Sequence, residues 1–294
     1  MTRNLVKSKL LKHFLRSPSA IIGTAIILSS LFAAAFAPFL APQNPYDLTT
    51  ISLKESLNPP IWMKGGHSPF LLGTDEQGRD ILSTILYGLR TSLIVGFVVV
   101  LSAGIVGGVI GLLAGYYEGK LSSIAMRTAD IAYSFPAIMV AILLMGLVGK
   151  RGLLVVILAI SAITWVRYAR TIRGKVLSEK NREYVLAARA IGASNLRVIG
   201  KHLLPNCLPP LLVIAAVDIA MVIMLESSLS YLGVGVPITE PSLGQLIFMG
   251  KGFLQAGKWW LVVFPGGTLI TFVLAINLVG DWLRVELSPR IRFV

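Results

Sequence analysis

Six apolar stretches, each long enough to cross a lipid bilayer as a helix, constrain this chain more than any other feature. A bilayer core needs roughly 20 apolar residues of helix, at ~1.5 Å of rise each. With 55% hydrophobic and 14% charged residues, the chain is too apolar for a water-soluble domain. The sequence therefore predicts an all-α membrane protein. The six predicted spans are 20–40, 91–115, 129–149, 153–169, 208–235 and 259–283.

The distribution of Lys and Arg predicts the orientation of these spans. Six spans place both termini on one side, and the segments assigned to that side carry 19 of the 27 Lys and Arg residues. Because basic loops stay on the inner side of the membrane, both termini are predicted to be cytoplasmic. The predicted division is a cytoplasmic segment 1–19, a first span 20–40, an extracytoplasmic loop 41–90, a core 91–283 with a basic cytoplasmic loop 170–207, and a cytoplasmic tail 284–294.

The first span has some features of a secretory signal peptide. It follows five basic residues and ends in Ala35-Phe36-Ala37, which fits a cleavage site. However, its apolar stretch is longer than a typical signal core, and Pro38 follows the cleavage position directly. We therefore expect an uncleaved helix.

Enzymatic and nucleotide-binding motifs are missing from the sequence. Gly252 to Lys258 resembles the start of a phosphate-binding loop, but Trp259 follows where Ser or Thr is needed to ligate magnesium. The chain has three His residues, no nucleophile elbow and a single cysteine, Cys207, so neither a catalytic centre nor a metal site nor a disulfide is expected. The net charge of +13 fits cytoplasmic loop bias better than a nucleic-acid surface. Any ATP and magnesium chemistry must belong to a partner subunit.

Two carboxylates lie within the fifth predicted span. Asp218 and Glu226 are separated by about two helical turns. A carboxylate near a bilayer centre costs roughly 2.5–3.5 kcal/mol, so each needs a stabilising environment. Two interpretations stay open: these residues line a wet translocation path or subunit interface, or neighbouring helices neutralise them.

Five glycines recur along the second predicted span at small-residue spacing. They are Gly104, Gly107, Gly108, Gly111 and Gly115. Such spacing lets helix backbones approach closely in lipid. Packing within the chain is the favoured interpretation, and contact with another subunit is the alternative.

The segment 183–206 reads as two short helices around a turn. Tyr184, Ala187, Ala188 and Ile191 recur at helical spacing, and Gly192 is a natural helix stop. Ser194 is placed to cap a second helix, in which Leu196, Ile199 and Leu203 share a face and which Pro205 closes. A partly apolar knob in a basic cytoplasmic loop is expected to dock into another protein.

This segment resembles the EAA loop of ATP-binding-cassette (ABC) importer permeases. Ala187-Ala188, Gly192 and Leu204-Pro205 match the motif at its spacing, while Leu186 and His202 replace its Glu and Ile. Glu183, one turn earlier, is placed to compensate for Leu186. The resemblance implies that an ATPase-coupling interface includes Glu183, Tyr184, Ala187, Ala188, Gly192, Ser194, Leu204 and Pro205.

Three further motifs make the chain similar to the peptide/nickel group of these permeases, specifically its C-type subunit. They are Leu72 to Ser83, Leu229 to Gly235 and Asn277 to Arg284. In the first, Thr74 and Gln77 are spaced as a capping box for an amphipathic helix, with Ile81, Leu82, Ile85, Leu86 and Leu89 on its apolar face. We expect this helix to lie on the outer membrane surface.

The resemblance implies a type I ABC importer permease fold with a cytoplasmic coupling helix, in a bacterial cytoplasmic membrane. The implied partners are a homologous permease, two ATP-binding subunits and an extracytoplasmic solute-binding protein. Di- or oligopeptides are the first expectation for the cargo; nickel, chelates, opines, glutathione and sugars stay open. The alternative is a self-contained secondary transporter or channel, but the chain shows neither ion-coupling groups nor an inverted repeat.

Overall fold

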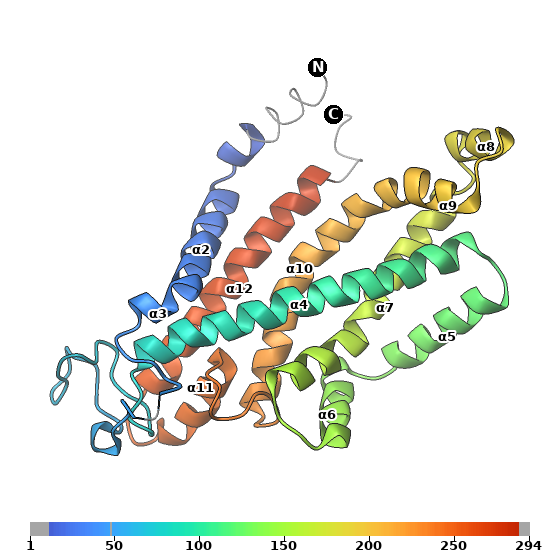
Figure 1. The fold of residues 1–294 in the computed structure, drawn as a ribbon. Coiled ribbons are helices and arrows are strands. Elements are labelled where there is room, and N and C mark those ends of the chain that lie inside the picture. Colours follow the sequence, from blue (N-terminus) through green and yellow to red (C-terminus); the bar gives the residue numbers. More distant parts are fainter. Residues whose placement is uncertain (1–11, 48, 288–294) are drawn as a thin grey trace.

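The computed structural model describes residues 12–47 and 49–287, and these fold into helices joined by loops (Figure 1). Within these residues the extended backbone pairs at one isolated bridge, between Thr74 and Asp80. The all-α prediction is therefore confirmed. The helices are α2 (Pro18–Ala35), α3 (Ala37–Leu40), α4 (Ile81–Tyr116), α5 (Lys120–Tyr133), α6 (Ala137–Val148), α7 (Leu153–Glu179), α8 (Glu183–Ala190), α9 (Asn195–Arg197), α10 (Leu204–Tyr231), α11 (Leu243–Gly250) and α12 (Trp260–Leu287).

Five long helices can cross a membrane, and a bent pair makes up a sixth span. The five are α2, α4, α7, α10 with the turns that precede it, and α12, while α5 and α6 meet at an angle of 96°. The single helix predicted over 129–149 is therefore wrong. Pro136 cannot donate a backbone hydrogen bond, and a residue before proline, here Phe135, is pushed out of the helical region. The helix breaks at this point.

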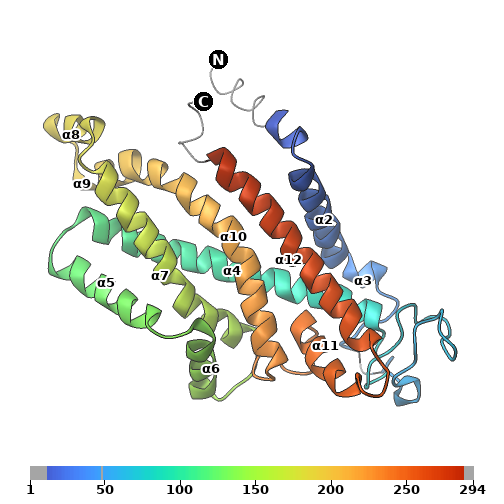
Figure 2. The same cartoon turned by 180° about the vertical axis from the view of Figure 1, so that it is seen from behind.

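The elements gather at two ends of the bundle. The start of α2, the end of α12 and the small helix α8 lie at one end (Figures 1 and 2). The loop 41–80 and α11 lie at the opposite end. This arrangement matches six crossings of one membrane. The outermost predicted segments fall partly outside the described residues, at 1–11 and 288–294.

The helix predicted to lie on the outer membrane surface is instead the first part of α4. Ile81, Ile85 and Leu89 are buried, and they belong to one core cluster with Leu243 of α11 and Trp260 of α12. Their apolar face therefore packs against protein and not against lipid headgroups. The predicted capping box is also wrong, as described below.

The glycine stripe brings α4 against α7. A Cβ atom added at Gly107 would lie 2.2 Å from the carbonyl oxygen of Trp165, and one added at Gly111 would lie 2.3 Å from that of Ala169. A Cβ at Gly115 would lie 2.7 Å from Cβ of Val176. These glycines therefore serve packing within the chain, and their size sets how closely the two helices approach.

Candidate functional site

The first candidate site is the segment 183–205, which we call the coupling loop. It contains α8, which projects from the ends of α7 and α9 (Figures 1 and 2). After α8, Gly192 adopts a left-handed φ of +82°. Its N–H donates to the carbonyl of Arg189 at 2.9 Å, and the N–H of Ala193 donates to that of Ala188 at 3.0 Å. This is a Schellman motif, so the predicted stop at Gly192 is confirmed.

The second half of the coupling loop differs from the prediction. Ser194 occupies the N-cap position of α9, but its side chain makes no capping hydrogen bond. The chain then passes through a π-helical turn, Val198–Leu203, directly into α10. Pro205 therefore starts α10 and does not end a helix. Pro205 has no backbone N–H to donate, and its ring needs space in the preceding turn. The wider π turn fits both requirements.

The inner face of the coupling loop packs onto the bundle. Val185 and Ala188 of α8 are buried, as are Val198 and Leu203 of the π turn. Most of these side chains form a cluster with the ends of the long helices; its buried members are Leu112, Ile172, Val176, Val185, Val198, Ile199, Leu203 and Cys207. The coupling loop is therefore held on α4, α7 and α10, and a force applied to it reaches three spans.

Polar contacts fix the same loop. The hydroxyl of Tyr184 donates to Oε2 of Glu179 at 2.8 Å, and Nδ2 of Asn206 donates to the hydroxyl of Tyr184 at 3.1 Å. The same Asn206 nitrogen donates to the carbonyl of His202 at 2.8 Å. Burial, together with the bond to Glu179, raises the pKa of Tyr184 above its ordinary value. The phenol therefore stays protonated and acts as the donor.

The outer face of the coupling loop is apolar and exposed. Ile191 is 86% exposed, Leu196 is 82% exposed, and Leu186 is also exposed. The face predicted to be shared by Leu196, Ile199 and Leu203 is wrong, because Leu196 is exposed whereas Ile199 and Leu203 are buried. In the first helix, Ile191 is exposed whereas Ala188 is buried. The other predicted coupling residues that are exposed are Glu183, Tyr184, Ala187, Gly192, Ser194, Leu204 and Pro205.

The second candidate site is a hollow of about 490 Å³ between the α5–α6 break, α7 and α10. Nη1 of Arg167 donates to Oδ1 of Asp218. The Asp218 side chain is 3% exposed, whereas that of Arg167 is 45% exposed. The lining includes Tyr133, Phe135, Thr164, Arg167, Asp218 and Ser228. We call it the charged hollow, and its accessible charge is positive.

Sequence reasoning placed Arg167 near the end of the predicted span 153–169 and named no partner for it, so this pair was missed. α7 continues to Glu179, about three turns beyond the end of the predicted span 153–169. Arg167, Arg170 and Arg173 recur at intervals of three along this helix. That spacing, which places charges near one helix face, was the available signal.

Glu226 has a different environment. Its side chain is fully buried within this chain. The hydroxyl of Ser230 donates to Oε1 at 2.8 Å, and those of Ser227 and Ser92 donate to Oε2 at 3.3 Å and 3.4 Å. These surroundings favour the interpretation in which neighbouring residues satisfy the carboxyl group. They do not favour its exposure to a path.

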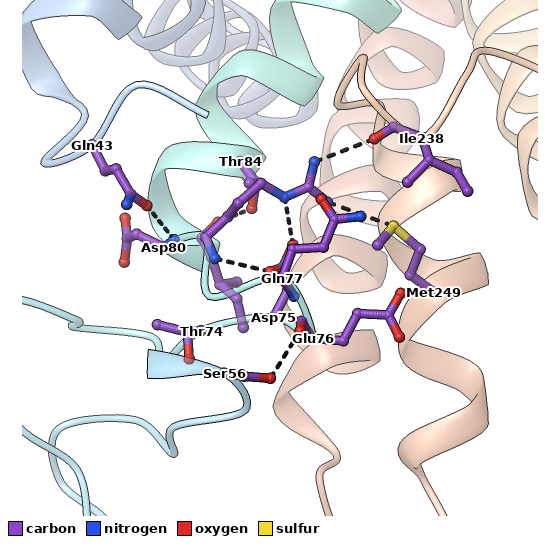
Figure 3. Close-up of polar contacts among 12 residues, drawn as sticks. Gln43, Ser56, Thr74, Asp75, Glu76, Gln77, Asp80, Thr84, Ile238 and Met249 are labelled. Atoms are coloured by element: carbon purple, nitrogen blue, oxygen red, sulfur yellow. Dashed lines mark hydrogen bonds and ion pairs between the residues drawn. The ribbon is translucent and has the colours of Figure 1, made fainter. Parts of the chain in front are cut away.

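A third polar cluster lies at the opposite end, where the motif 72–83 folds back on itself (Figure 3). Nε of Arg79 donates to Oδ2 of Asp75 at 2.7 Å, and both side chains are buried. Nη1 of Arg79 donates to the carbonyl of Ile238 at 3.2 Å, and Nη2 lies 3.5 Å from the sulfur of Met249. The motif therefore ties the loop 41–80 to α11 and the segment before it.

Capping at the start of α4 follows from this cluster. Asp80, not Thr74, is the N-cap residue, and its Oδ2 accepts from the backbone N–H of Ser83 at 2.7 Å. Thr74 instead accepts from the backbone N–H of Asn58 at 2.8 Å and donates to the carbonyl of Glu55. Gln77 donates its backbone N–H to Asp75 at 2.9 Å. The Thr74 side chain, which the capping-box pattern predicted to cap the helix, thus makes long-range contacts instead.

Comparison with known proteins identifies the family. The family described as binding-protein-dependent transport system inner membrane component matches residues 107–293, more than half of the chain. The chain belongs to this family. The permease also matches the N-terminal transmembrane domain of oligopeptide transport permease C over residues 8–60.

Two relatives resemble the permease over almost its whole length. The dipeptide transport system permease protein DppC of Haemophilus influenzae is 38% identical over 280 residues, which cover 95% of this chain and 93% of the relative. The di/tripeptide transport system permease protein DppC of Pseudomonas aeruginosa is 37% identical over 281 residues, which cover 96% and 91%. The permease is accordingly a multi-pass transport subunit of the inner membrane and not an ATPase.

A solved structure supports the fold. The inward-facing MetNI methionine ABC transporter aligns with 69% of this chain and 96% of its own, with a TM-score of 0.57 and 22% identity. The permease therefore has the type I ABC importer fold that the resemblance implied. Membership of this family implies, in general, a partner permease, separate ATP-binding subunits and a substrate-binding protein.

Proposed function

We propose that this permease forms half of the translocation pathway of an ATP-driven importer for di- or oligopeptides. The relatives named above are described as dipeptide and di/tripeptide permeases, which supports di- or oligopeptides as the cargo. The proposed assembly contains a homologous permease, two ATP-binding subunits that hold ATP and magnesium, and an extracytoplasmic solute-binding protein.

The observation that carries the coupling role is the two-sided coupling loop. Its inner face is buried on three spans, and its outer face presents Leu186, Ile191 and Leu196 to solvent. Exposed apolar side chains on a rigid knob mark a protein-docking surface. We propose that the ATP-binding subunits dock there and move the knob when they close on ATP. Leu186 then supplies an apolar contact where the family motif has a glutamate.

The charged hollow indicates which face borders the pathway. Arg170 pairs with Asp130 at 2.6 Å on the same side of α7 and α5, where both side chains are exposed. By contrast, the groove between α4 and α10 is lined by residues such as Phe97, Leu101 and Leu212. Charges within spans are costly against lipid. We therefore propose that the α5–α7 face turns toward the partner permease and water, and that the α4–α10 groove turns toward lipid.

Uptake by the reconstituted assembly tests this function. Proteoliposomes are prepared with both permeases, the ATP-binding subunits and the binding protein. They should accumulate a labelled dipeptide only when ATP is present on the side of the membrane that carries the ATP-binding subunits. An ionophore should not abolish this uptake. If the chain alone accumulated peptide on an ion gradient, the secondary-transporter alternative would be correct.

Orientation is a separate expectation with its own measurement. In a Cys207→Ala background, cysteines at the exposed positions Lys54 and Lys251 should react with a membrane-impermeant maleimide on intact spheroplasts. Cysteines at the exposed positions Arg189 and Lys201 should react only after permeabilisation, because basic segments stay cytoplasmic. Labelling of position 189 on intact spheroplasts would contradict the coupling role.

A further inference from the structure

The charged hollow has the properties of a ligand site inside the membrane. Arg167 is the fifteenth residue of α7, so it lies about 20 Å along the helix from Leu153. α7 is long and apolar enough to cross a membrane, and about 20 Å is less than the roughly 30 Å thickness of a hydrocarbon core. An ionisable residue at that depth marks a functional site by default. The volume of about 490 Å³ is also within the range of small-molecule sites.

The exposed half of the ion pair decides which charge a ligand meets. Asp218 is almost fully covered, and one of its oxygens accepts from Arg167. Within the described residues, the guanidinium makes this one hydrogen bond and keeps its other donors free on an exposed side chain. Asp218 therefore orients the guanidinium of Arg167, whose free N–H groups face the hollow. Planar guanidinium donors match a carboxylate in a bidentate geometry.

The remaining walls suit a peptide. Tyr133 and Phe135 contribute aromatic surface at the α5–α6 break, and Ser228 and Thr164 contribute hydroxyl groups. The break itself frees backbone groups near the hollow, a feature of substrate sites built on discontinuous membrane helices. Apolar walls with few polar groups would accept different side chains while one fixed group is recognised.

We propose that Arg167, oriented by Asp218, binds the carboxylate of a peptide as it passes through the membrane. This proposal rests on the proposed peptide import and adds the group recognised inside the permease. The walls offer few other polar groups, so peptides with different side chains would fit the hollow.

Thiol labelling tests the site without transport. In a Cys207→Ala background, a cysteine at Thr164 should react with an anionic thiosulfonate about tenfold faster than with a cationic one at low salt, because Arg167 attracts the anion. A neutral pair, Arg167→Gln with Asp218→Asn, should remove this preference. A free dipeptide at millimolar concentration should slow the reaction, and its C-terminal amide should not. Equal rates for both reagents in the wild-type background would overturn the proposal.

Uptake separates cargo contact from a structural role. With the neutral pair, both permeases should still co-purify and binding-protein-stimulated ATP hydrolysis should persist, while dipeptide uptake falls about tenfold or more. Swapping the charges, Arg167→Asp with Asp218→Arg, keeps an ion pair but exposes an anion, so uptake should stay low. The neutral pair Glu118→Gln with Lys180→Gln removes an ion pair outside the lining; it is the matched control and should transport normally.

Three results would contradict the proposal. Normal uptake by the neutral pair would exclude a cargo contact. Recovery of uptake by the swapped pair would show a structural ion pair. Loss of co-purification with the neutral pair would show that Arg167 binds the partner permease instead. In each case wild-type dipeptide uptake still reports on the proposed function, so the two can fail separately.

Discussion

Replacing Gly192 with Val should reduce dipeptide uptake at least about tenfold while all spans still insert. Gly192 has a φ of +82°, and a side chain with a Cβ atom disfavours that region by roughly 1–2 kcal/mol, more when branched. A Cβ there would meet nothing within 4 Å, so the effect is conformational and not a clash. The Schellman turn should open, so the exposed side chains of Ile191 and Leu196 should no longer hold the same positions relative to each other. The measurement is uptake together with recovery of the ATP-binding subunits on the purified permease.

Two further variants isolate the cause. Gly174 in α7 is exposed, also has open space around it and has no positive φ, so Gly174→Val is the matched control and should leave uptake nearly unchanged. Gly192→Asn should retain much of the activity, because Asn tolerates the left-handed region. Full recovery of the ATP-binding subunits and normal uptake with Gly192→Val would mean that the coupling loop is not the docking element.

Replacing Arg79 with Met should destabilise the permease by about 3–5 kcal/mol, since it leaves the buried carboxylate of Asp75 without its partner. The change also removes the contacts to Ile238 and Met249 that hold α11 against the loop 41–80. The apparent midpoint of thermal unfolding in detergent should fall accordingly. Lys54 is exposed in the same loop, so Lys54→Met is the matched control and should unfold like the wild type.

The double variant Asp75→Asn with Arg79→Met distinguishes an uncompensated charge from lost packing. It should be less destabilised than Arg79→Met alone, because no buried carboxylate is left unpaired. An Arg79→Met protein as stable as the Lys54→Met protein would show that the buried pair does not hold the two segments together.

Local sequence pattern was sufficient for the number of spans and for the helix stop at Gly192. Apolar length reports membrane crossing directly, because each span must satisfy its own backbone hydrogen bonds in lipid. A glycine after a short helix likewise acts through its own backbone freedom. The family motifs are short and contiguous, so the type I importer fold could also be recognised from the sequence.

Contacts between distant segments decided the remaining features. Arg167 and Asp218 are 51 positions apart, and only the packing of α7 on α10 brings them together. The helix starting at Ile81 had the pattern of a surface helix, yet α11 and α12 cover its apolar face. Leu196 and Leu203 share a helical spacing, but the π turn rotates one outward. A periodic pattern states which residues share a face of an element, whereas the neighbouring elements decide whether that face meets protein, lipid or water.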